Sequence, residues 1–234
     1  YFYYCSNNFN GSQNRSNPKF MNHKLYDMMS DTDYRKDLIL KDAPSTFDAW
    51  DKGQNAGRYA SEDEYDAAVA DYRVIVNNSS RHNMVPYMHI KLSQSDGPTI
   101  TPMDVIHMRA GEMYLTEAEA LARSGDNSGA QDVLFELVSE RDPGYEKSTN
   151  TGQDLIDEIL VQRRLELFLE GHRWFDMLRN DEALDLEDTG ADPDLYDDGY
   201  KQAKPSSNPN WVFLIPQREL NANPNMEQNV HITN

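Results

Sequence analysis

Arginines and carboxylates are densely mixed between residues 162 and 179, in the segment QRRLELFLEGHRWFDMLR. Helical spacing places Arg163 near Glu166, and Glu166 near Glu170. After Gly171 the charged series continues with Arg173, Asp176 and Arg179. Such a mixture is compatible with an active site, but planar guanidinium groups also bind carboxylates bidentately and fix helix junctions. We interpret the cluster as structural, assign it no catalytic or ligand-binding role, and expect loss of Glu170 or Arg173 to impair folding.

Carboxylate chemistry is easy to imagine in this chain, because it contains 40 Asp and Glu residues among 234. Glycoside hydrolysis needs two carboxyl groups about 5 Å or about 6.5–9.5 Å apart, one of them with a raised pKa. Sequence shows neither property, so a glycoside hydrolase stays an alternative. Asp192-Pro193-Asp194 and Asp197-Asp198-Gly199 have the composition of a calcium loop but lack the EF-hand spacing and its closing Glu. Adventitious binding of calcium by these residues stays an alternative, and we predict no specific metal site.

Other catalytic and cofactor patterns are missing from the sequence. The six histidines form no H-E-x-x-H pattern, and Cys5 has no CxxC partner. The sequence has no G-x-G-x-x-G or Walker loop. We therefore predict no catalytic residue and no cofactor.

Aromatic residues in the first hundred positions indicate a different chemistry, the binding of sugars. Trp50 and Tyr59 flank the glycine- and asparagine-rich segment DKGQNAGR, and Tyr1, Tyr3 and Tyr4 open the chain. Aromatic faces beside Asn, Asp and Arg suit sugar rings, whose C–H faces are apolar and whose edges are polar. We predict ligand contacts by Trp50 and Tyr59, supported by one or more of the three N-terminal tyrosines. Packing of each ring against a neighbour is the alternative.

Composition restricts the partners. A net charge of -18 repels nucleic acid and anionic lipid, whereas a neutral ligand stays compatible. The chain has no apolar run of ~20 residues that would span a membrane. The single cysteine allows no internal disulfide framework. The length favours one domain.

Residues 1–100 predict mostly loops with short helices. One helix is expected from Pro18 to Met29. Another follows Ser61, which has the capping-box spacing to Glu64, and runs to about Tyr72. Residues 84–92 alternate weakly and predict an extended segment, because a proline at position 86 cannot donate to a strand ladder.

Regular structure is clearer in residues 101–183. Thr101 is a suitable N-cap before a proline, which predicts a helix from Thr101 to Arg123 that stops at Gly125. A second antiparallel helix is expected over 128–141, with Ala118 and Ala130 at the contact. The predicted buried face of the first helix consists of Ala110, Gly111, Tyr114, Ala118, Leu121 and Ala122. Alignment on Tyr114 puts Ala118, Gly125, Ala130 and Leu134 at tetratricopeptide positions.

Two further helices are expected over 151–170 and 172–180. The acidic stretch from 180 to 200 has no Lys or Arg and predicts a solvated loop. Residues 184–234 are therefore expected to form this loop and a C-terminal tail. Apolar residues 211–216 are expected to pack back onto the helices.

Three segments in order resemble the C-terminal half of the SusD/RagB family. They are RAGEMYLTEAEA at 109–120, RRLELFLEGHRWFD at 163–176, and PQRELNANP at 216–224. Two departures from the family pattern are mild, namely Arg141 as the remaining arginine of an arginine-rich helix end and Gln162 where Glu is frequent. The match before residue 84 is thinner.

The resemblance implies a mainly α, tetratricopeptide-like superhelix with long loops, of which residues 1–234 are the C-terminal part of one domain. It implies a non-enzymatic protein on the surface of the outer membrane that binds an oligosaccharide and delivers it to a SusC-like, TonB-dependent transporter. Its ligand-contacting aromatics are expected on loops such as those of residues 1–100. Oligopeptide capture is the leading alternative, and a pure protein-interaction scaffold is another. The lipid anchor and further helical repeats are expected to precede this part of the protein.

Overall fold

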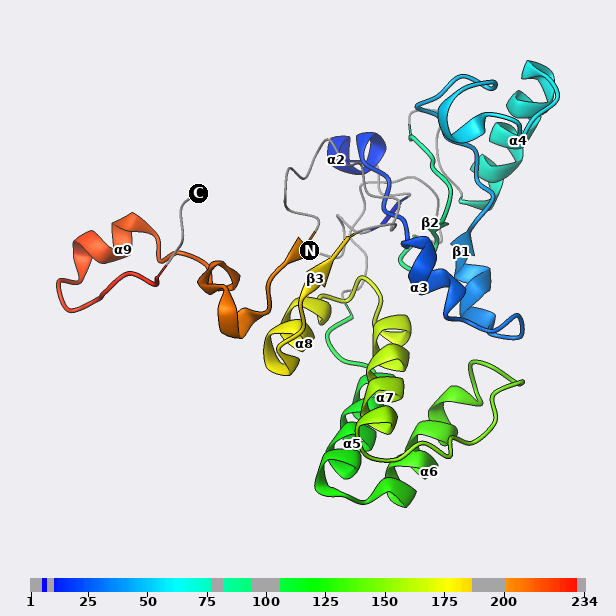
Figure 1. Ribbon diagram of the computed structural model, residues 1–234. Helices are drawn as coiled ribbons and strands as arrows, with labels where there is room; N and C mark the ends of the chain where they lie inside the picture. Colours follow the sequence, from blue (N-terminus) through cyan, green and yellow to red (C-terminus); the bar gives the residue numbers. More distant parts are fainter. Residues whose placement is uncertain (1–5, 8–10, 77–81, 94–105, 187–200, 231–234) are drawn as a thin grey trace. The chain divides into compact units, whose positions relative to one another are not determined.

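The computed structural model describes residues 6–7, 11–76, 82–93, 106–186 and 201–230 (Figure 1). It divides into two compact units, Tyr1–Glu170 and Gly171–Asn234. Both units contain helices joined by long irregular segments, and their strands are only two residues long (Figure 1). The predicted mainly α fold is confirmed.

The first part of unit 1 is held together by loops and short elements. Its elements are α2 (Ser12–Ser16), α3 (His23–Asp27), η1 (Tyr34–Leu38), β1 (Ile39–Leu40), η2 (Gly53–Asn55), α4 (Glu62–Ile75) and β2 (Met88–His89). β1 and β2 pair antiparallel, with Ile39 opposite His89. β2 confirms the extended segment predicted for residues 84–92 at 88–89 only, because residues 86–87 and 91–92 form turns and Tyr87 has a left-handed φ of 60°.

The helix predicted from Pro18 to Met29 is wrong at its start. Asn22 is the N-cap, and its side chain accepts a hydrogen bond from the Leu25 N–H at 2.8 Å, so α3 begins at His23. The preceding Phe20 is extended and forms a β-bridge with Met88. An asparagine cap and a bridge partner remote in sequence therefore shorten the helix to five residues.

The helix predicted after Ser61 is confirmed as α4, which continues to Ile75 rather than Tyr72. The Ser61 hydroxyl accepts from the Glu64 N–H at 3.3 Å. In return, the Glu64 carboxylate accepts from the N–H of Ala60, one residue before the cap, at 2.7 Å. These two bonds occupy N–H groups that a helix start would otherwise leave unpaired.

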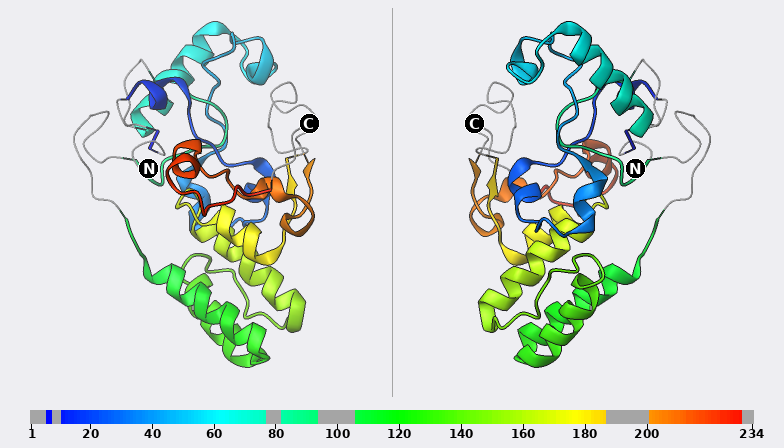
Figure 2. Two further views of the ribbon diagram at one scale, coloured as in Figure 1. Left: turned by 90° about the vertical axis from the view of Figure 1, so that its left-hand side faces the viewer. Right: turned by 90° about the vertical axis from the view of Figure 1, so that its right-hand side faces the viewer.

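Three longer helices form the main core of unit 1: α5 (Ala110–Ser124), α6 (Asn127–Val138) and α7 (Gly152–Glu166). α5 and α6 lie side by side as an antiparallel pair, and α7 packs against both (Figure 2). Ala118 and Ala130 are fully buried in this core, as predicted. The small side chains allow the close approach of the two helices.

The start and the buried face of α5 differ from the prediction. Residues 101–105 lie outside the described residues, and 106–109 are not helical, because Arg109 is the extended N-cap. Ala110 is exposed, whereas Leu115 and Glu119 are buried. The stop at Gly125 is confirmed by its left-handed φ of 92°.

α7 ends at Glu166 instead of residue 170. Leu167 is its C-cap, and Leu169 has a left-handed φ of 63°, which a continuing helix does not allow. The chain therefore turns through residues 167–170, and this turn presents backbone carbonyl groups to other parts of unit 1.

Unit 2 contains α8 (Arg173–Asn180), β3 (Leu184–Asp185), β4 (Lys201–Gln202), η5 (Pro205–Ser207), η6 (Pro209–Trp211) and α9 (Gln217–Ala222). α8 confirms the predicted helix over 172–180. β3 pairs antiparallel with β4, so the loop predicted over 180–200 contains a short strand at 184–185. Residues 187–200 lie outside the described residues.

Trp211 anchors the tail within unit 2. It is 1% exposed, its Nε1–H donates to the Ala203 carbonyl at 2.7 Å, and its ring lies 4.8 Å from that of Trp174. Phe213 also stacks on Trp174 but is 80% exposed. Packing of residues 211–216 onto a helix is therefore confirmed for Trp211 and incomplete beyond it.

Candidate ligand-binding site

Asn55 organises the loop that carries Trp50, one of the predicted aromatic contacts. Its side chain is fully buried, and its Nδ2 donates to the carbonyl oxygens of Ser45, Asp48 and Ala49 at 2.8, 3.0 and 3.2 Å. Its Oδ1 accepts from the Ser45 N–H at 3.0 Å. One amide thus connects four backbone groups of residues 45–49 to position 55 and closes residues 45–55 into a loop.

Gly53 is required at the turn of the same loop. Its φ is +51°, and a Cβ placed there would lie 2.2 Å from Oδ1 of Asp48. The Asp48 carboxylate accepts from the Gln54 N–H at 3.1 Å. A glycine therefore permits both the left-handed backbone and the close approach of the carboxylate.

Tyr59 is held by its neighbours on one side. Its ring meets that of Tyr65 edge to face at 5.4 Å, and the Arg58 guanidinium lies 5.5 Å from its centroid. Arg58 in turn donates to the carbonyl oxygen of Asp42 at 2.6 Å, which fixes its position. The Tyr65 hydroxyl donates to the Ser45 carbonyl at 3.1 Å, and this bond connects α4 to the loop.

Trp50 lies within this loop, Tyr59 follows it between Asn55 and α4, and both side chains are partly exposed. The other three predicted contacts, Tyr1, Tyr3 and Tyr4, lie outside the described residues. Asn55 is missing from the predicted contacts, although an asparagine between glycines is a frequent loop residue and could have indicated its role.

A second site in unit 1 is built around the Glu166 carboxylate. Arg109 Nη1 donates to its Oε1 at 2.8 Å. Arg141 donates from Nε to Oε2 at 3.1 Å and from Nη2 to Oε1 at 3.2 Å. Arg35 Nη1 forms a longer ion pair with Oε2 at 3.8 Å. Three arginines from different segments thus meet on one carboxylate whose side chain is 3% exposed.

Glu170 is the second carboxylate of this site. Arg109 donates to it from Nε at 2.8 Å and from Nη2 at 2.7 Å, and Lys91 Nζ donates to it at 2.6 Å. Lys91 also donates to the backbone carbonyls of Glu166 and Phe168, at 2.6 and 3.1 Å. The lysine therefore satisfies carbonyl groups that the end of α7 leaves without helical partners.

Electrostatics at this site favour the charged carboxylates. Burial by itself would raise the pKa of Glu166, but hydrogen bonds from Arg141 and Arg109 outweigh burial and lower that pKa to about 2. Burial is likewise outweighed at Glu170, where bonds from Arg109 and Lys91 lower the pKa. Burial lowers the pKa of Lys91, and its bond to Glu170 offsets only part of that effect. Both carboxylates stay ionised at neutral pH.

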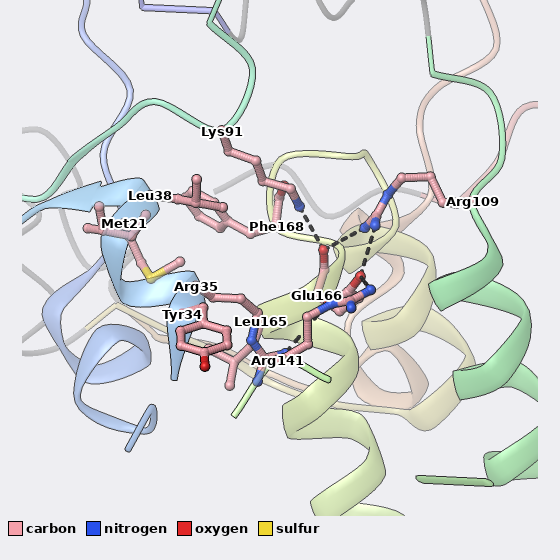
Figure 3. Close-up of a pocket in the computed structure, with 11 residues that line it drawn as sticks. Met21, Tyr34, Arg35, Leu38, Lys91, Arg109, Arg141, Leu165, Glu166 and Phe168 are labelled. Carbon is pink, nitrogen blue, oxygen red and sulfur yellow. Dashed lines mark hydrogen bonds and ion pairs between the residues drawn. The ribbon is translucent and has the colours of Figure 1, made fainter. Parts of the chain in front are cut away.

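A pocket of about 350 Å³ adjoins these ion pairs (Figure 3). Its polar lining residues are Tyr34, Arg35, Lys91, Arg109, Arg141 and Glu166. The apolar lining residues are Met21, Leu38, Ile39, Leu165 and Phe168. These side chains come from η1, the extended segments around α3 and β2, and the ends of α5, α6 and α7, so residues distant in the sequence form one cavity.

The structural interpretation of the charged cluster is supported for Glu166 and Glu170, whose carboxylates are occupied by ion pairs. The cluster is, however, divided. Arg163 lies in α7 and is within 3.4 Å of the Thr116 hydroxyl, whereas Arg173 belongs to unit 2 and pairs with Glu182 at 2.6 Å. The partners of Glu166 come from positions 35, 109 and 141, which the sequence could not indicate because no local spacing relates them.

Neither a membrane-spanning helix nor a metal centre occurs among the residues that the structure describes. No helix in this part of the chain is long and apolar enough to cross a membrane. No group of His, Cys, Asp or Glu in the same residues is arranged to hold a metal ion.

Comparison with known proteins gives consistent matches. The model of the SusD family matches residues 2–231. The SusD-like protein P38 of Formosa agariphila is 32% identical over 141 residues, which cover 57% of this chain and 25% of that protein. The chain therefore spans about a quarter of this relative's length.

Two solved structures from Bacteroides vulgatus are similar. A SusD superfamily protein matches with a TM-score of 0.53 and 24% identity over 90% of this chain and 38% of that chain. A SusD-like carbohydrate binding protein matches with a TM-score of 0.48 and 22% identity over 78% of this chain and 31% of that chain. The first of these two likenesses establishes a shared fold.

Proposed function

This chain belongs to the SusD family, a class of carbohydrate-binding nutrient-uptake proteins, and we propose that it captures an oligosaccharide at the cell surface. The whole protein delivers this ligand to a SusC-like, TonB-dependent transporter and is held at the outer membrane by a lipid anchor. Trp50 and Tyr59 provide the main sugar contacts, together with one or more of Tyr1, Tyr3 and Tyr4.

The observation that carries this proposal is the loop closed by Asn55. Its four hydrogen bonds fix residues 45–55 before any ligand binds. A fixed loop loses little conformational entropy on binding, so more of the contact energy is available for affinity. Trp50 is partly exposed on this loop, and the exposed Asp51, Lys52 and Gln54 next to it offer hydrogen bonds to sugar hydroxyl groups.

A neutral ligand fits the charge of the protein. The net charge of -18 disfavours a polyanionic glycan. Stacking of aromatic rings on the apolar face of a sugar ring needs no complementary charge.

Binding without turnover is part of the proposal. A glycosidase needs a carboxylic acid with a raised pKa beside a second carboxylate. The pKa values of Glu166 and Glu170 are both lowered by arginine and lysine neighbours, which is the opposite of a general acid. Incubation of the full-length protein with polysaccharides should release no new reducing ends, and sustained, dose-dependent release would favour the hydrolase alternative.

The direct test is calorimetry with the full-length protein and a panel of neutral oligosaccharides. Each stacked ring is expected to contribute about 1–3 kcal/mol, so Trp50→Ala should weaken affinity for the preferred glycan roughly ten- to hundredfold. Phe175→Ala is the matched control, because Phe175 is an aromatic residue that is 66% exposed on α8.

Equal affinities for the wild type and the Trp50→Ala, Tyr59→Ala double variant would show that this loop is not the sugar site. A parallel panel of oligopeptides distinguishes the ligand class. Saturable peptide binding without any glycan binding would replace the oligosaccharide proposal by its peptide alternative.

A further inference from the structure

The pocket beside Glu166 has cations at its surface and carboxylates deeper inside. The side chains of Glu166 and Glu170 are 3% and 5% exposed. The side chains of Arg35, Arg109 and Arg141 are 10%, 26% and 34% exposed. All three guanidinium groups lie around one cavity in Figure 3. A small ligand in this cavity therefore meets positive groups before negative ones.

Not all the N–H donors around the pocket are occupied. Lys91 Nζ makes three hydrogen bonds, and Arg109 makes four. Arg141 uses Nε and Nη2 on Glu166, but its Nη1 donates to no acceptor in the described part of the chain. Arg35 Nη1 has, within the same residues, only the 3.8 Å ion pair with Glu166.

The guanidinium groups of Arg141 and Arg35 both contact Glu166 and line the same pocket. Arg141 Nε lies 3.1 Å, and Arg35 Nη1 3.8 Å, from the same Oε2 atom of Glu166. A hydrogen bond from the Tyr34 N–H to the Arg141 carbonyl, at 2.8 Å, also joins their two segments. Guanidinium N–H groups bind carboxylate oxygens well, and the Nη1 groups of Arg35 and Arg141 belong to two side chains of this pocket.

The rest of the cavity is apolar. Met21, Leu38 and Phe168 face it from three segments (Figure 3), and Ile39 and Leu165 complete its lining. A volume of about 350 Å³ lies in the range of small-molecule sites. A ligand with many hydroxyl groups would leave most of them unpaired against this wall, which is costly.

We propose that the pocket binds a small monocarboxylate with an apolar body. Its carboxylate accepts hydrogen bonds from Arg141 and Arg35, and its hydrocarbon part lies against Leu38, Ile39 and Phe168. A dianion or polyanion is disfavoured, because Glu166, Glu170 and Asp33 lie close to the same arginines. This site is separate from the sugar contacts proposed at Trp50 and does not depend on them.

The test uses calorimetry of the full-length protein with benzoate, benzamide and glucuronate at neutral pH. Benzoate should bind, whereas benzamide, which has the same shape without the charge, should not. Arg141→Gln should weaken benzoate binding about ten- to hundredfold, as expected for charge-assisted hydrogen bonds. Lys147→Gln is the control, because it removes a positive charge from a partly exposed pair with Asp132 that does not line the pocket.

Leu38→Glu provides an independent variant, since Leu38 lines the pocket, is 36% exposed and takes no part in the ion pairs. Its new carboxylate should repel benzoate and abolish binding even if Arg141→Gln fails to fold. Three results would each overturn the proposal. They are no binding heat with benzoate at millimolar concentration, equal binding heat with benzamide, and full benzoate binding by a folded Leu38→Glu variant. Tighter binding of glucuronate than of benzoate would overturn the assignment of an apolar ligand body. Glycan affinity is measured in the same variants and should not change, so failure here is distinguishable from failure of the proposed function.

Discussion

Acidification should destabilise this protein through Glu166 in particular. Its carboxylate is 3% exposed and accepts hydrogen bonds from Arg109 and Arg141. Protonation of Glu166 removes the negative charge with which both arginines pair, and their guanidinium groups are then poorly compensated. The folded state therefore resists protonation of Glu166 far more strongly than the unfolded chain does.

The size of this effect follows from the two pKa values. The pKa of Glu166 is about 2 in the folded protein, compared with 4.5 for an unperturbed glutamate. A pKa difference of one corresponds to about 1.4 kcal/mol, so the ionised carboxylate contributes about 3 kcal/mol to the free energy of unfolding. Because the folded pKa is depressed, this contribution is fully present above the unfolded pKa of 4.5 and is lost as the pH falls through about 2.

Urea denaturation at a series of pH values between 7 and 2.5 measures this contribution, with Glu166→Gln compared to the wild type at each pH. The difference in unfolding free energy between the two proteins should shrink as the pH falls, because the glutamine cannot be protonated in this range. Glu117→Gln is the matched control, since Glu117 is exposed on α5. If the difference in unfolding free energy between the wild type and Glu166→Gln stays constant from pH 7 to pH 3, the assignment of the depressed pKa to Glu166 is refuted.

Three further predictions concern packing, the loop and unit 2. Ala118→Leu should overpack the α5–α6 contact, cost roughly 1–3 kcal/mol and lower the Tm by about 2–4 °C per kcal/mol; an unchanged Tm would contradict this contact. Asn55→Ala should leave the Ser45 N–H and the Asp48 carbonyl without their partner, which costs about 1–3 kcal/mol for each group. Hydrogen exchange at the Ser45 amide should then accelerate, and unchanged protection would show that Asn55 does not fix the loop. Arg173→Ala should lower the free energy of unfolding in urea by no more than about 1 kcal/mol, because the paired side chains of Arg173 and Glu182 are 38% and 29% exposed. A loss of several kcal/mol would restore the expectation of a buried pair.

The sequence predicts helix ends well where a single residue determines them. Gly125 stops α5 because a left-handed residue with no Cβ closes the last turn. Ser61 and Glu64 start α4 because each occupies a backbone N–H within four residues. Ala118 and Ala130 lie at the helix contact because small side chains at helical spacing let two helices approach closely. In the first two cases the deciding interaction is local, and in the third it needs only the neighbouring helix.

The sequence predicts poorly where the deciding interaction is remote. Phe20 is extended because it pairs with Met88, so no pattern within residues 18–29 shows that the helix must begin later. Thr101 has good capping chemistry, yet Arg109 is the actual N-cap of α5, and its guanidinium is engaged with Glu166 and Glu170. Pocket residues from positions 21 to 168 share no spacing in the sequence, and the pocket could not be predicted for that reason.

Glu166 and Glu170 connect the loop-rich part of unit 1 to the end of α7. Arg35 and Lys91 belong to segments with two-residue strands and a short 3₁₀ helix, whose buried apolar side chains form clusters separate from the core of α5, α6 and α7. Ion pairs to the two carboxylates connect these segments to the end of α7, where the core of α5, α6 and α7 already fixes the backbone. Within the described residues, the same arrangement leaves Nη1 of Arg141 without a hydrogen-bond acceptor and Nη1 of Arg35 with only a 3.8 Å ion pair. The carboxylate binding that we propose for the pocket would therefore use donors of the same arginines that connect the loops to α7.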